Sequence, residues 1–78
     1  MSFCEWLEKT KGFTPKSAHD AQSRLKRVFE LTGKQSVNAN TLTDLAVNPS
    51  FLSLSISIKS QLRRTTKLYL EYQESETK

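Results

Sequence analysis

The sequence predicts an all-α protein: one SAM-like domain, a four-helix orthogonal bundle with two long and two short helices. Hydrophobic residues recur at helical spacing in four segments, and glycine, proline or polar residues separate these segments. The one stretch with strand-like alternation has no second strand to pair with. A chain of 78 residues forms one domain near the lower limit for independent folding. We expect its core at about residues 2–73 and a frayed acidic tail at 74–78.

The first short helix begins at Ser2 and ends before Gly12. Ser2 stands three residues before Glu5, which is the spacing of a capping box. Gly12 ends the helix because glycine readily adopts the conformation that follows a last helical turn. The apolar face consists of Phe3, Trp6 and Leu7.

The first long helix begins around Thr14 and Pro15 and ends at Gly33. Proline suits the first helical position because the N–H that it lacks would have no partner there. A sector roughly 100° wide holds the residues expected in the core, which are Ala18, Ala21, Leu25, Val28, Phe29 and Thr32. The opposite side carries Lys16, Asp20, Ser23 and Arg27.

Residues 34–40 are polar and aperiodic and predict a connecting loop. Asn40 or Thr41 then caps a short helix that runs to about Val47, with Thr41 and Asp44 at capping-box spacing. Asn48 precedes Pro49, and a residue before proline avoids the helical conformation, so the helix ends there. The buried edge of this helix is expected to hold Leu42, Leu45 and Ala46.

The segment from Phe51 to Ser60 alternates apolar residues and serines, as a β-strand does. It also begins a helical stripe, and a strand without a partner leaves its backbone groups unpaired. We therefore predict a turn that anchors Phe51 and Leu52 in the core, and then a long helix from residues 53–57 to about Gln73. The stripe of this helix is Leu54, Ile58, Leu62, Thr65, Tyr69 and Tyr72.

Catalytic residue types are scarce, and we expect no enzyme, no metal or other cofactor and no small-molecule substrate. His19 is the only histidine and is expected at the surface, while the single cysteine, Cys4, is expected to be structural and half-buried. A lone thiol suits a reducing compartment, and no apolar run approaches the roughly 20 residues that span a bilayer. We therefore expect a cytoplasmic protein without membrane contact.

The charge distribution carries the functional signal. The net charge is +4, but Lys9 to Lys67 hold eleven of twelve basic and three of eight acidic residues, a local charge of +8. Basic residues mixed with hydroxyls suit phosphate contacts, because the charges release counterions and the hydroxyls fix register. On the last helix, Lys59, Arg63 and Lys67 recur every four residues opposite the apolar stripe, and the first long helix carries further basic residues beside serines. A solvated lysine-rich surface that aids solubility is the plainer interpretation.

The aromatic residues Phe3, Trp6, Phe29, Phe51 and Tyr69 fall on core-facing stripes. Their placement does not favour stacking on single-stranded bases.

Residues 3–31, FCEWLEKTKGFTPKSAHDAQSRLKRVFEL, combine a short helix with an aromatic-x-x-Trp-Leu core and a second helix with a basic segment. The short TLTDL helix and the final KSQLRRTTKLYLEY helix continue a four-helix plan. This pattern resembles the N-terminal, SAM-like core-binding domain of tyrosine recombinases and phage integrases. The resemblance implies a non-catalytic module that holds one side of double-stranded DNA beside a recombinase catalytic domain. Carried over by position, it places the DNA contacts on the first long helix at Lys16, Ser17, Arg24 and Arg27, and on the last helix at Lys59, Arg63, Arg64 and Lys67. Tyr69 and Tyr72 do not stand in the setting of the nucleophilic tyrosine of that family.

Two other functions remain open. SAM-like helical domains also serve as protein-interaction adaptors, which need no nucleic acid. A helix-turn-helix regulator fits less well, because residues 34–40 are longer than the 3–4-residue turn of that motif.

Overall fold

The computed structural model describes residues 2–34 and 36–77, and these residues form helices and connecting segments with no β-strand among them. The all-α prediction is therefore confirmed. Within the described residues there are five helices rather than four. They are α1 (Phe3–Thr10), α2 (Pro15–Thr32), α3 (Thr41–Ala46), α4 (Pro49–Leu52) and α5 (Ile56–Thr77).

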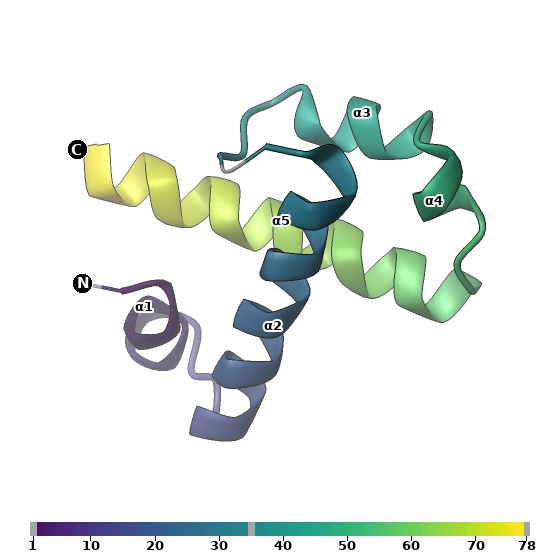
Figure 1. Cartoon of the computed structure of the whole chain (residues 1–78). Coiled ribbons are helices and arrows are strands. Elements are labelled where there is room, and N and C mark those ends of the chain that lie inside the picture. The colour runs from purple at the N-terminus through teal and green to yellow at the C-terminus, as the bar shows by residue number, and fades with distance from the viewer. Residues whose placement is uncertain (1, 35, 78) are drawn as a thin grey trace.

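The two long helices cross each other and form the most extensive helix–helix contact, with α2 lying across the middle of α5 (Figure 1). On one side of the crossing, α1 packs against α2 and α5. On the other side, α3 packs against both long helices, and α4 packs against α3. The fold is thus a crossed pair of long helices with α1 on one side and the short helices α3 and α4 on the other. No helix in the described part of the chain is both long and apolar enough to cross a membrane.

The ends of α1 and α2 lie where the sequence predicts them. The Ser2 hydroxyl accepts a hydrogen bond from the Glu5 amide at 3.2 Å, and the Thr14 hydroxyl accepts one from the Ser17 amide at 3.2 Å. Gly33 follows α2 with a φ of 69°, in the left-handed region where glycine is favoured. Local capping by Ser2, Thr14 and Gly33 therefore accounts for the positions of these helix ends.

The predicted capping box of α3 is wrong. Asn40 occupies the N-cap position without a side-chain bond to the helix, and Thr41 is the first helical residue. The buried Thr41 hydroxyl instead accepts a hydrogen bond from the Asn38 amide at 2.9 Å, so it ties the incoming loop to the helix. The predicted buried edge is also partly wrong, because Leu45 is buried but Ala46 is exposed and Leu42 is half-buried.

The turn predicted before the last helix contains a further helical turn, α4. Asn48 caps it by accepting a hydrogen bond from the Phe51 amide at 3.0 Å, and Pro49 occupies the first helical position. Phe51 is 1% exposed, as predicted. Leu52 is 52% exposed, so its predicted core position is wrong. One helical turn can direct only part of its surface toward the core.

The alternating segment is helical, as predicted, from Ile56 onward. Ile56 is 78% exposed, whereas Leu62 and Thr65, six and nine residues further on, are buried, so the helical period prevails over the alternation. The helix extends beyond the predicted end at Gln73 and continues to Thr77, and Lys78 lies outside the described residues. Residues 74–77, which the sequence places in a frayed tail, are helical, and the fraying itself stays a prediction.

The core has two parts, one on each side of the crossing. We call the first the aromatic cluster, whose buried members are Phe3, Trp6, Leu7, Ala18, Ala21, Leu25 and Val37. We call the second the small cluster, whose buried members are Val28, Leu45, Phe51 and Leu62. Val37 belongs to the segment that the sequence predicts to be a polar loop, yet it is 5% exposed.

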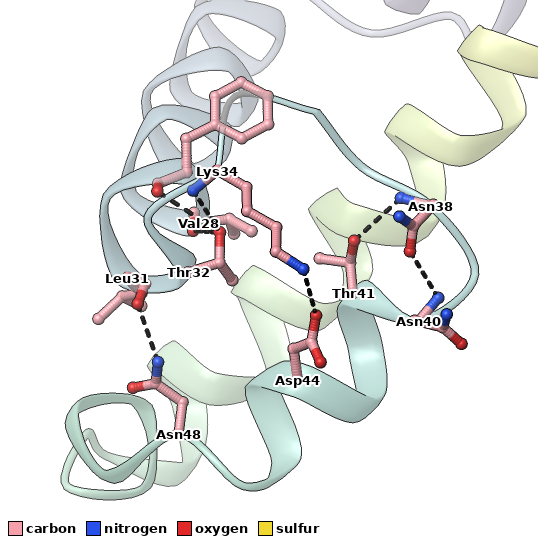
Figure 2. Close-up of polar contacts among 10 residues, drawn as sticks. Val28, Leu31, Thr32, Lys34, Asn38, Asn40, Thr41, Asp44 and Asn48 are labelled. Atoms are coloured by element: carbon pink, nitrogen blue, oxygen red, sulfur yellow. Dashed lines mark hydrogen bonds and ion pairs between the residues drawn. The ribbon is translucent and has the colours of Figure 1, made fainter.

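Polar contacts tie the end of α2 to the short helices beside the small cluster (Figure 2). The Asn48 amide group donates a hydrogen bond to the Leu31 carbonyl at 2.8 Å. The Lys34 ammonium lies 3.3 Å from a carboxylate oxygen of Asp44. These contacts add polar links between the end of α2 and the segment that contains α3 and α4.

Candidate nucleic-acid interface

A groove of about 460 Å³ lies between α2 and α5. Of the eight residues predicted to contact nucleic acid, Ser17, Arg24 and Arg64 line this groove. Ser17 and Arg24 are seven residues apart, about two helical turns, so they lie on the same side of α2. Arg64 comes from α5, so the crossing of the two long helices brings the residues together. The other polar residues of the lining are Thr14, Asp20, Gln61 and Thr65.

The two arginines of the groove have no ionic partner in the part of the chain that the structure describes. The ion pairs found there join Lys11 to Glu71 and Lys34 to Asp44. The carboxylate of Asp20 lines the groove but lies more than 4 Å from both guanidinium groups. Arg24 and Arg64 thus offer donors to an external anion, and guanidinium can bind phosphate oxygens in a bidentate manner.

The other predicted contacts do not line the groove. Lys16 and Arg27 on α2 and Lys67 on α5 are exposed, while Lys59 is half-buried. At about 100° per residue, Arg63 points well away from its neighbour Arg64. The Arg63 guanidinium lies 5.9 Å from the ring centroid of Phe51, so it covers the small cluster. The stripe of Lys59, Arg63 and Lys67 is therefore partly engaged with α4 rather than being a fully solvated face.

Thr65 belongs to the groove, although sequence reasoning placed it with the core. It occupies the apolar stripe of α5 and is 3% exposed, as a core position should be. Its side chain nevertheless reaches the groove between the two long helices. The signal that could have found it is a hydroxyl on an otherwise apolar stripe, next to Arg64.

Cys4 and His19 are the residues whose types most often act in catalysis or metal binding. Burial, with a smaller effect of Glu8, raises the pKa of the Cys4 thiol, whereas a nucleophilic thiolate needs a lowered pKa. The single proton of the thiol can be donated to the Gln22 side-chain oxygen, which is the nearer acceptor at 2.6 Å, or to the Ala18 carbonyl at 3.5 Å. His19 is exposed, as predicted. In the described ranges, no group of three or more His, Cys, Asp or Glu side chains could hold a metal ion.

A second groove, of about 590 Å³, lies beside the aromatic cluster, and Phe3, Phe29, Tyr69 and Tyr72 line it together with Lys26 and others. The Phe3 and Tyr69 rings meet edge to face with centroids 5.1 Å apart, and Phe29 meets Tyr69 at 5.9 Å. Burial, followed by Glu76, Tyr69 and Glu5, raises the pKa of Tyr72. The predicted core packing of Phe3, Trp6, Phe29, Phe51 and Tyr69 is confirmed, because each is buried or packs against a cluster.

No protein-family model, curated protein or solved structure matches this chain. The likeness to recombinase core-binding domains therefore stays a prediction from the sequence pattern.

Proposed function

We propose that the chain is a non-catalytic module that binds double-stranded DNA through the basic side of α2 and α5. The observation that carries this proposal is the shared groove of Arg24 and Arg64. Each comes from a different long helix, and neither has a carboxylate within 4 Å among the described residues. The exposed Lys16, Arg27 and Lys67 extend the positive surface beyond the groove.

The charge pattern supports DNA over a small anion as the partner. Phosphates repeat along a duplex, so dispersed lysines and arginines around one groove can each neutralise a different phosphate. The hydroxyls of Thr14 and Ser17 beside Arg24 can fix the register of the backbone. We further propose that the crossed helices form a SAM-like domain of the recombinase core-binding type, which would act beside a separate catalytic domain.

Titration with duplex DNA at several salt concentrations tests the proposal. We expect binding at low salt, and we expect the logarithm of the binding constant to fall linearly with the logarithm of the salt concentration, because bound phosphates release counterions. The double variant Arg24→Ala/Arg64→Ala should weaken binding to all sequences alike and reduce the salt slope by about two.

The matched control is Lys9→Ala/Lys26→Ala, which removes the same charge from exposed positions outside the α2/α5 groove. We expect it to reduce affinity much less than the arginine pair. Equal effects of the two double variants would show a diffuse charge effect without a defined interface. No binding at low salt, or binding without a salt slope, would reject DNA as the partner.

A protein-interaction adaptor is the second candidate, and exposed apolar side chains favour it. Val47, Leu52 and Ile56 are 72%, 52% and 78% exposed, and all three lie in or beside the short connections around α4. A pull-down from nuclease-treated lysate with the wild type and with Leu52→Ser/Ile56→Ser tests this function. A partner that the wild type retains and the double variant loses would favour the adaptor.

A further inference from the structure

We propose that the α2/α5 groove is a site for one phosphate group, with the Thr65 hydroxyl as a ligand on its buried wall and Arg24 and Arg64 at its rim. This inference deepens the proposed DNA-binding function, because it names the group that the groove receives. It is tested separately below, since a phosphate site does not require DNA.

The hydroxyl of Thr65 is the observation that points to a ligand. Among the buried polar residues, Thr41 accepts a hydrogen bond from the Asn38 amide, and Thr66 donates one to the Leu62 carbonyl at 2.8 Å. Thr65 is 97% buried, yet its hydroxyl makes no hydrogen bond within the described residues. Among the described residues, the fully buried side-chain oxygen that lacks a partner is Gln73 Oε1, not the hydroxyl oxygen of Thr65. The Thr65 hydroxyl therefore keeps some accessible surface, and it can bond a polar group held in the groove that Thr65 lines.

The surrounding donors identify the chemistry of that group. Arg24 and Arg64 supply guanidinium N–H groups, while Ser17 and Thr65 supply hydroxyls. A phosphate has several strong acceptor oxygens and can accept from all of these donors at once. The groove volume of about 460 Å³ is ample for one phosphate and its attached sugar.

The carboxylate of Asp20 stands in the same groove and opposes a bound anion. It therefore provides a test of the charge of the bound group, because removing the Asp20 charge must strengthen the binding of an anion and weaken the binding of a cation. We expect Asp20→Asn to increase phosphate affinity several-fold. A decrease would show that the groove prefers a cationic group, and this result would overturn the proposal.

The direct experiment is an NMR titration of the full chain with inorganic phosphate, with chloride at matched ionic strength as the reference. We expect saturable shifts of the Ser17, Arg24 and Thr65 amides with phosphate and not with chloride. Thr65→Val removes the hydroxyl without changing the shape or the charge of the side chain. It should lower the affinity for phosphate about tenfold, which is the effect of losing one hydrogen bond to a charged group. Thr65→Ser should restore binding.

Thr66→Val is the matched control, because it removes the neighbouring buried hydroxyl, which does not line the groove. It should leave phosphate affinity unchanged in the folded protein. If Thr65→Val fails to fold, Thr65→Ala compared with Thr65→Ser gives the same contrast. Shifts that do not saturate, or equal affinity of Thr65→Val and wild type, would overturn the site.

Duplex DNA with and without 5′-phosphates distinguishes the source of the group. Tighter binding of the 5′-phosphorylated duplex that depends on Thr65 indicates a terminal phosphate, and equal Thr65-dependent binding indicates a backbone phosphodiester. Phosphate binding without duplex binding would reject the proposed function and keep this site. Duplex binding that is insensitive to Thr65→Val would keep the function and reject the site.

Discussion

The two sides of the helix crossing are stabilised by different means. The aromatic cluster holds α1 with rings that contact one another, such as Phe3 and Tyr72 with centroids 5.5 Å apart. The small cluster has four buried side chains to hold α3 and α4. Side-chain-to-backbone hydrogen bonds supplement it, above all those of Asn48.

This difference shows how a short chain distributes a limited supply of apolar residues. Where aromatic side chains are available, burial provides most of the stabilisation and tolerates small displacements. In the small cluster, whose four buried members include one aromatic ring, that of Phe51, directional bonds to backbone groups help to fix the position of each short helix. The α2/α5 groove lies on the aromatic side, since Phe13 and Leu68 belong to both the groove and that cluster. Damage to the small cluster should therefore spare the groove as long as α2 and α5 stay folded.

The largest expected effect comes from Phe51→Ala, which breaks the small cluster. Phe51 is 1% exposed and is the largest of the four buried members, so truncation should cost about 4–5 kcal/mol, the upper part of the usual range. Phe3→Ala in the aromatic cluster should cost about 3 kcal/mol, because the neighbouring rings can close part of the space. Urea denaturation measures both values. A larger loss for Phe3→Ala would contradict the view that the small cluster is less able than the aromatic cluster to fill the space left by a truncated side chain.

The next largest effect compares two helix caps: Asn48, which caps α4 and also bonds to α2, and Ser2, which only caps α1. Asn48→Ala removes the cap of α4 and leaves the Leu31 carbonyl without its partner, so we expect a loss of about 2–3 kcal/mol. Ser2→Ala removes a cap of α1 that joins no other helix and should cost about 1 kcal/mol. The same urea experiment measures both, with hydrogen exchange of the α3 amides as a local readout. Equal losses would show that the Asn48–Leu31 bond contributes little.

The sequence is sufficient for features that depend on near neighbours. The caps at Ser2 and Thr14, the positive φ of Gly33 and the apolar stripe through Leu62 all follow from spacing within a few turns. Features set by contacts between distant segments were not predictable. Val37 lies in a polar stretch but packs into the aromatic cluster, and its carbonyl accepts a hydrogen bond from Gln73.

The same limit applies to the candidate site. The sequence pattern selected eight residues, seven of them basic, but only the crossing of α2 and α5 shows that Arg24 and Arg64 share a groove. Arg63 carries the same charge as its neighbour, yet it turns to the Phe51 ring, because adjacent helical residues point about 100° apart. Helical periodicity cannot reveal which flank of α5 meets α2, so the sequence could not separate the two arginines.

The smallest expected effect concerns the ion pairs, of which each side has one among the described residues. Lys34 and Asp44 are well exposed, so Lys34→Ala should cost at most about 0.5 kcal/mol. Lys11 pairs with Glu71 and also lies 5.6 Å from the centroid of the Trp6 ring, so Lys11→Ala should cost about 1 kcal/mol. Glu71→Gln isolates the ionic part, and its effect should fall in 0.5 M salt, about fivefold the ionic strength at which the Debye length is roughly 10 Å. Urea denaturation at low and high salt gives all of these values. If Lys34→Ala proves as costly as Lys11→Ala, polar contacts on the small side are stronger than their exposure indicates, and the contrast between the two sides would widen.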